Sequence, residues 1–120
     1  MMKVFISQPM NGKSDEEILK RRKEIQDYCI KTFQKPCDFI DSFSKKDDTI
    51  RKGRIAMLGD SISLMCDAEL VVFDKGWEKT HGCRVERMVC AEYSIPVYDM
   101  GNPIARMHKI RTEDEVVFWR

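Results

Sequence analysis

The chain has 120 residues and nearly balanced charge, with 21 Lys and Arg against 20 Asp and Glu. This length accommodates one compact domain with a single core and excludes a multidomain protein. The net charge of +1 excludes the strongly positive surface of a dedicated nucleic-acid-binding protein. The longest apolar run, around residues 70–73, is far shorter than the roughly 20 residues of a membrane span, and the N-terminus lacks a targeting core. We therefore expect a cytoplasmic protein with no nucleic-acid or membrane partner.

The five cysteines, at positions 29, 37, 66, 83 and 90, contain no C-x-x-C pair. An odd number of cysteines cannot close into a full set of disulfides, so we expect reduced thiols. The grouping of His81, Cys83, Cys90 and the distant His108 lacks the paired short spacings of structural zinc sites, and we predict no metal.

The first half of the chain predicts two strands around a helix. Residues 3–7 predict a strand that ends at a loop containing Pro and Asn-Gly. Ser14 and Glu17 form a capping-box pattern, so a helix begins at Ser14 and continues until Pro36 ends it. Residues 37–40 predict a second strand, and the polar residues 41–53 predict a loop.

The second half continues the alternation. An apolar stripe predicts a helix at about residues 54–66, and it consists of Ile55, Leu58, Ile62, Met65 and Cys66. Further along, a strand at 69–73, a loop at 74–79, a helix at 80–93 and a strand at 95–98 are predicted. This order favours an α/β fold, a Rossmann- or flavodoxin-like three-layer sandwich with a mainly parallel sheet of about four to five strands.

The chain is expected to form one domain, residues 1–120, with a C-terminal tail at about 104–120. The tail ends in the apolar residues 116–119, which predicts that it docks on the domain or on a neighbouring subunit. We therefore expect a homo-oligomer.

Ligands of open parallel sheets bind beyond the carboxyl ends of the strands, where one acidic residue stands out. On a helical wheel of residues 80–93, Glu86 falls on the buried face. A buried carboxylate is costly without a partner and has a raised pKa, which makes Glu86 the leading candidate for chemistry. The alternative is that the helix rotates slightly and Glu86 pairs with Arg84, Arg87 or Lys79.

Three motifs occur in order at the expected strand ends: residues 6–12 (ISQPMNG), 60–67 (DSISLMCD) and 76–86 (GWEKTHGCRVE). With them the chain resembles the nucleoside 2-deoxyribosyltransferase superfamily over about residues 3–98. The resemblance is to a small bacterial and phage branch of that superfamily.

The resemblance implies cleavage or deoxyribosyl transfer at the anomeric carbon of a deoxynucleoside or its 5′-monophosphate. Glu86 would be the nucleophile and Asp60 the assisting carboxylate, with Asp67 as the near alternative. Two carboxylates suffice for an oxocarbenium-like transition state, so no organic cofactor or metal is expected. The structural alternatives are an exposed helix position for Asp60 and a helix C-terminal turn for Asp67.

The expected substrate contacts come from the loop after the first strand and from the start of the third helix. Backbone amides near Ser14 and the side chains of Ser7 and Asn11 offer donors to an anion such as a 5′-phosphate. The full set is Ser7, Gln8, Pro9, Met10, Asn11, Gly12, Trp77, Thr80 and Gly82. Their alternative roles are structural, as turn residues, as a helix N-cap at Thr80 and as a packed Trp77.

Two residues depart from the family pattern. Phe5 stands where better-studied relatives carry a tyrosine that orients the nucleophile, and Gln8 replaces the glycine before the loop proline. Both departures favour an alternative function, a nucleotide- or ADP-ribose-type binding protein that uses the same crevice without turnover. A third hypothesis, an interaction domain built on the apolar tail, predicts oligomerisation without nucleotide affinity.

Overall fold

The computed structural model of the chain describes residues 1–43 and 51–102. The expected tail at about 104–120 lies outside the described residues, as does the middle of the loop expected at 41–53. Within the described ranges, strands and helices alternate along the chain.

Four short strands of the described residues form one sheet in which every neighbouring pair is parallel. They are β1 (Met2–Ser7), β2 (Cys37–Phe39), β3 (Leu70–Phe73) and β4 (Val97–Asp99). Their order is β2-β1-β3-β4, and Ser7 lies opposite Phe73 where β1 and β3 end. The strand order reverses between β1 and β3, which is where open α/β sheets bind ligands.

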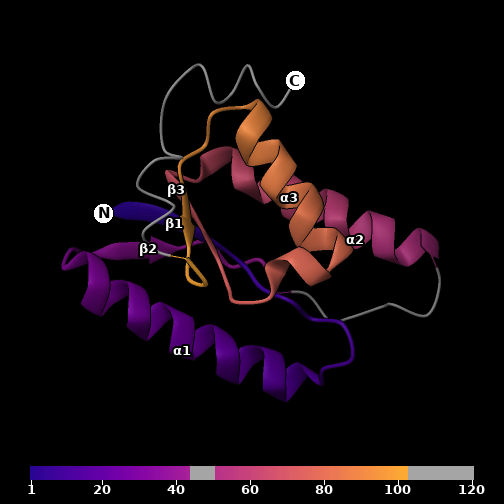
Figure 1. Ribbon diagram of the computed structural model, residues 1–120, viewed down its shortest axis with the longest axis horizontal. Helices are drawn as coiled ribbons and strands as arrows, with labels where there is room; N and C mark the ends of the chain where they lie inside the picture. Colours follow the sequence, from indigo (N-terminus) through magenta and orange to yellow (C-terminus); the bar gives the residue numbers. More distant parts are fainter. Residues whose placement is uncertain (44–50, 103–120) are drawn as a thin grey trace.

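Helices cover both faces of this sheet (Figure 1). Helix α1 (Asp15–Phe33) lies along one face, and α2 (Arg51–Leu64) and α3 (His81–Glu92) lie on the other side. The short 3₁₀ helices η1 (Met65–Asp67) and η2 (Trp77–Lys79) precede and follow β3. The predicted three-layer α/β architecture is therefore confirmed.

The alternation of side chains along β1 places successive residues in different layers. Ile6 packs in the cluster that includes α1 residues, whereas Phe5 packs with Cys90 of α3. By the same alternation Ser7 points toward α3 and Gln8 toward α1, as their hydrogen bonds show. At the end of β1, polar side chains therefore point to both faces of the sheet: Ser7 toward α3 and Gln8 toward α1.

The helix predicted at about residues 54–66 is confirmed as α2 and η1, but its apolar stripe is only partly buried. Met65 is buried in the core, Leu58 and Ile62 are half-buried, and Ile55 is 64% exposed. Ile55 and Leu58 line a cavity instead of packing into the core.

All five cysteines are free thiols. Burial raises the pKa of the Cys29 and Cys90 thiols to about 12, which leaves them protonated and weakly reactive at neutral pH. No helix in the described ranges has both the length and the apolar character needed to cross a membrane.

The start of α1 supports a prediction about stability. The capping box is present, with the Glu17 amide donating to Ser14 Oγ at 3.2 Å and the Ser14 amide donating to Glu17 Oε1 at 2.9 Å. We expect Ser14→Ala to lower the free energy of unfolding by about 1 kcal/mol, measured by urea denaturation, because the cap loses its acceptor. Ser14→Asp keeps a capping oxygen and is the matched control; equal loss in both variants would argue against the cap.

Candidate active site

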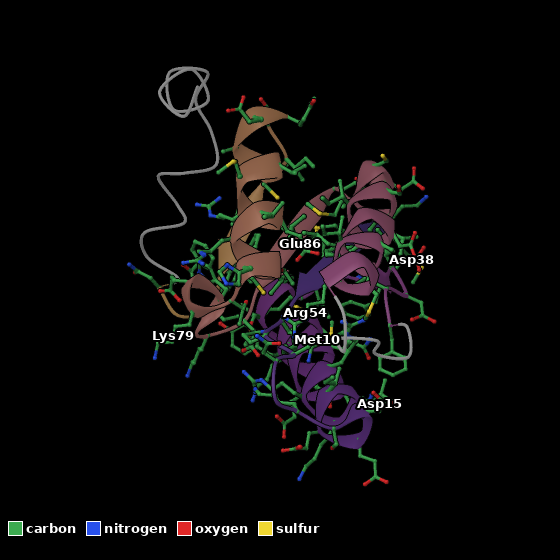
Figure 2. The ribbon with its side chains drawn as sticks, turned by 90° about the vertical axis from the view of Figure 1, so that its right-hand side faces the viewer. Met10, Asp15, Asp38, Arg54, Lys79 and Glu86 are labelled. Atoms are coloured by element: carbon green, nitrogen blue, oxygen red, sulfur yellow. The ribbon has the colours of Figure 1, made fainter. Side chains whose placement is uncertain are left out.

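A cavity of about 300 Å³ lies beyond the carboxyl end of β1, between the loops and the helices α2 and α3. Its lining is Gln8, Met10, Asn11, Ser42, Arg54, Ile55, Met57, Leu58, Ser61, Thr80, His81, Gly82, Cys83 and Glu86. Figure 2 shows Glu86, Arg54 and Met10 gathered between α3, α2 and the β1 loop, with Asp15, Asp38 and Lys79 toward the outside.

Glu86 lies on the buried side of α3 and is 7% exposed. Ser7 Oγ donates a hydrogen bond of 2.6 Å to Glu86 Oε1. Burial raises the pKa of Glu86 to about 7, an effect opposed by the Ser7 hydrogen bond and by the positive charge of Arg22. A carboxyl group that is partly ionised and partly protonated near neutral pH suits a nucleophile or an acid–base catalyst.

Arg22 of α1 hydrogen-bonds two of the residues that line the cavity, Gln8 and Ser42. Its guanidinium, 6% exposed, donates from Nε to Gln8 Oε1 at 2.7 Å and from Nη1 to Ser42 Oγ at 2.9 Å. The amide of Gln8 in turn donates from Nε2 to the Ile18 carbonyl at 3.1 Å. Burial lowers the pKa of Arg22, while the negative charges of Asp41 and Glu86 oppose this effect.

The structure brings most of the expected contact residues to one cavity. Gln8, Met10, Asn11, Thr80 and Gly82 line it together with Glu86, and Ser7 reaches Glu86 from the end of β1. Three further expected contacts, Pro9, Gly12 and Trp77, are not among the lining residues. Pro9 is half-buried, and Gly12 is exposed with a φ of +75°, which fits a turn residue.

The expected second carboxylate does not reach the cavity. Asp60 is exposed on α2 and is not among the lining residues, although its neighbour Ser61 is. Successive helix residues point about 100° apart, so the face that brings Ser61 to the cavity directs Asp60 away from it. Asp67 is exposed in η1. Among the lining residues that the structure describes, Glu86 is the only carboxylate.

Trp77 takes the packed position that was its alternative, whereas Thr80 lines the cavity but its side chain does not cap α3. Trp77 lies outside the lining, donates from Nε1 to Asp99 Oδ2 at 3.1 Å and packs on Phe73 with ring centroids 5.3 Å apart. Trp77 therefore has a structural role at the carboxyl ends of β3 and β4. Thr80 is the N-cap residue of α3, but its hydroxyl donates back to the Trp77 carbonyl at 3.4 Å and makes no cap hydrogen bond.

Sequence reasoning missed several lining residues, among them Ser42, Arg54 and Cys83, and the buried Arg22 behind them. Arg22 had a detectable signal, because it falls on the same helical stripe as the buried Ile18, Ile25 and Cys29. Cys83 is also buried, and burial raises the pKa of its thiol.

No family model, curated protein or solved structure matches the chain. Within residues 1–43 and 51–102, no cluster of three or more His, Cys, Asp or Glu side chains has an arrangement that could hold a metal ion.

Proposed function

We propose that the protein cleaves the N-glycosidic bond of a deoxynucleoside or a deoxynucleoside 5′-monophosphate, or transfers its deoxyribosyl group, with Glu86 as the nucleophile. The observation that carries this proposal is the buried carboxylate of Glu86, held by the Ser7 hydroxyl at 2.6 Å in the wall of a small cavity. Burying an ionisable carboxylate lowers the stability of a fold. Its retention at this position therefore favours a chemical role for Glu86.

The proposed reaction has two steps. In the first, a Glu86 oxygen bonds to the anomeric carbon while the carbon–nitrogen bond breaks, and the base leaves with that electron pair and takes up a proton from solvent. In the second, water or another base attacks the same carbon and releases Glu86 as a carboxylate. Because Ser7 holds Oε1, Oε2 is the oxygen available for attack.

The lining divides into parts that suit a nucleoside. The side chains of Ile55, Met57 and Leu58 from α2, with Met10 from the β1 loop, give the cavity apolar walls for a base. Asn11 and Thr80 add hydrogen-bonding groups suited to a sugar. The cavity of about 300 Å³ is at the small end of ligand pockets.

A second candidate is a nucleotide- or ADP-ribose-type binding protein without turnover. The observation that favours it is the exposed position of Asp60, which leaves Glu86 as the one carboxylate among the described lining residues. Phe5, 1% exposed, adds no hydroxyl to orient Glu86.

The test is incubation of the purified protein with deoxynucleosides and their 5′-monophosphates, with and without a second free base, followed by chromatography. We expect released or exchanged base from at least one substrate, and no product with Glu86→Gln. Product that depends on the second base would identify a transferase, and product without it a hydrolase. No product from any substrate, together with ligands that raise the melting temperature, would reject catalysis in favour of the binding protein.

A further inference from the structure

Three buried polar side chains lie next to one another where β1 ends and α3 begins. Ser7, Cys83 and Glu86 are 1%, 3% and 7% exposed. Cys83 and Glu86 are three residues apart in α3, so they lie on the same face of the helix, and both line the cavity. The Ser7 hydroxyl donates to Glu86 Oε1 at 2.6 Å and also lies within hydrogen-bonding reach of the Cys83 thiol. Cys83 is therefore in contact with the residue that holds the proposed nucleophile.

The number of hydroxyl protons fixes the direction of the hydrogen bonds at Cys83. Ser7 has one hydroxyl proton, and Glu86 accepts it. Thr80, the other hydroxyl within reach of the thiol, donates its proton to the Trp77 carbonyl at 3.4 Å. Neither hydroxyl has a second proton to give to the sulfur. The thiol is therefore the donor, and burial keeps it protonated by raising its pKa.

Ser7 is the better acceptor for the Cys83 proton. A hydroxyl that donates a short hydrogen bond to a carboxylate is polarised, so its oxygen accepts a further hydrogen bond more strongly. The Thr80 hydroxyl gains less, because it makes only a long bond of 3.4 Å to a neutral carbonyl. The three side chains thus form a chain of donors that runs from Cys83 to Ser7 and from Ser7 to Glu86.

We propose that Cys83 is a positioning residue for the nucleophile: its thiol donates to Ser7 Oγ and so directs the Ser7 proton to Glu86. The inference rests on the proposed function, because the role of Glu86 as nucleophile makes its orientation and ionisation matter. Cys83 itself does not react and acts only through Ser7. Its hydrogen bond strengthens the donation from Ser7, which favours the ionised carboxylate and keeps Oε2 as the oxygen available for attack.

Several charged or titratable groups surround this chain of donors, and they are the same in every variant of Cys83. Within the described ranges they come from both faces of the sheet and either line the cavity or interact electrostatically with Glu86, Cys83 or Arg22. They are Arg22, Asp41, Arg54, Asp74, His81 and Cys90. Because these groups are kept, a difference between Cys83 variants reports the side chain at position 83.

The test is a ¹³C NMR titration of the Glu86 carboxyl in the full chain, which needs neither ligand nor turnover. We expect Cys83→Ala to raise the midpoint by about half a pH unit, because the Ser7 hydrogen bond loses its cooperative strengthening. Cys83→Ser retains a donor and should leave the midpoint within about 0.2 pH unit of the wild type or lower it. If Cys83→Ala does not fold, Cys83→Val fills the space without a donor and should raise the midpoint in the same way.

Two further variants separate the hydrogen bond from packing. In Ser7→Ala protein, the additional change Cys83→Ala should produce no further shift, because the thiol acts through Ser7. Cys90→Ala removes a second buried thiol from α3, one that packs in the core with Phe5, and should leave the midpoint in place. An unchanged midpoint in Cys83→Ala, an equal rise in Cys83→Ser, or an equal shift with and without Ser7 would overturn the inference.

Failure of the inference and failure of the proposed function give different results. The expected shifts without base release from any substrate by the wild-type protein support the chain of donors and reject the glycosyl transfer. Base release that is lost in Glu86→Gln, together with an unchanged midpoint in Cys83→Ala, supports the transfer and rejects the positioning role of Cys83.

Discussion

Replacing Glu86 with glutamine is expected to raise the free energy of unfolding by about 3 kcal/mol above pH 8 while lowering base release at least about a thousandfold. The two effects have one cause. The buried carboxylate that destabilises the fold when it is ionised is also the group that the proposed reaction needs in its ionised form. Gains in stability on loss of an active-site residue are typical of functional strain.

The sign of the pH dependence follows from burial. The pKa of Glu86 is raised from 4.5 to about 7 in the folded protein. Well below pH 4.5 the side chain is neutral in both the folded and the unfolded chain, and its burial costs no stability through ionisation. Between pH 4.5 and 7 the unfolded chain ionises first, so the fold loses stability as pH rises, and above 7 the full loss is present. Glutamine does not ionise, so this decline disappears in the variant.

Urea denaturation at pH 4.5, 7 and 8.5 measures the effect. The wild-type protein and Glu86→Gln should be nearly equal in stability at the lowest pH and diverge as pH rises. Glu78→Gln, at an exposed position in η2, is the control and should follow the wild-type curve. Parallel curves for the wild type and Glu86→Gln would show that Glu86 is not held in a destabilising site.

The fold was predictable from the sequence because its signals are local. The β-branched run of β1, the Ser14 capping box and the break at Pro36 each depend on residues close together in the chain. All three agree with the observed bounds of β1 and α1 within a few residues. The order of the strands in the sheet, β2-β1-β3-β4, was not predicted, because it depends on contacts between segments that are distant in the sequence.

Glu86 was predictable from the helical wheel of α3, but its partner was not. The wheel placed the carboxylate on the buried side, which is confirmed, and left open a pairing with Arg84, Arg87 or Lys79. Its hydrogen-bond partner is Ser7, which is 79 residues away in the sequence. Arg84 contacts His81 instead, and Arg87 lies over the Phe73 and Trp77 rings.

The position of Asp60 and the burial of Arg22 were not predicted, because both depend on how a helix is rotated against the rest of the fold. Asp60 was expected in the site from a motif, but a motif does not fix the rotation of α2 about its axis, and that rotation brings Ser61 to the cavity instead. Arg22 was overlooked because, on a helix rich in charged residues of both signs, a charged side chain looks like a solvated one. Its position on the buried stripe of α1 was the signal that set it apart.

Replacing Ser7 with alanine is expected to shift the pH dependence of base release toward higher pH. The Ser7 hydroxyl donates to Glu86 Oε1 at 2.6 Å and so favours the ionised carboxylate. A hydrogen bond to a charged group contributes about 1.5 to 3 kcal/mol, so its loss should raise the pKa of Glu86 and move the midpoint up by about one pH unit or more. At pH 6 we expect kcat/KM to fall about tenfold to a hundredfold, with a much smaller loss at pH 9.

The measurement is kcat/KM from pH 5 to 10, together with a ¹³C NMR titration of the Glu86 carboxyl, assigned by its absence in Glu86→Gln. The NMR titration tests the role of Ser7 even if no substrate is turned over. Ser63→Ala removes an exposed hydroxyl from α2 outside the cavity lining and should leave the midpoint in place. A uniform loss of activity at every pH with an unchanged midpoint would mean that Ser7 contacts the substrate and does not tune Glu86. A shifted midpoint would instead show that the end of β1 sets the ionisation of the carboxylate on α3.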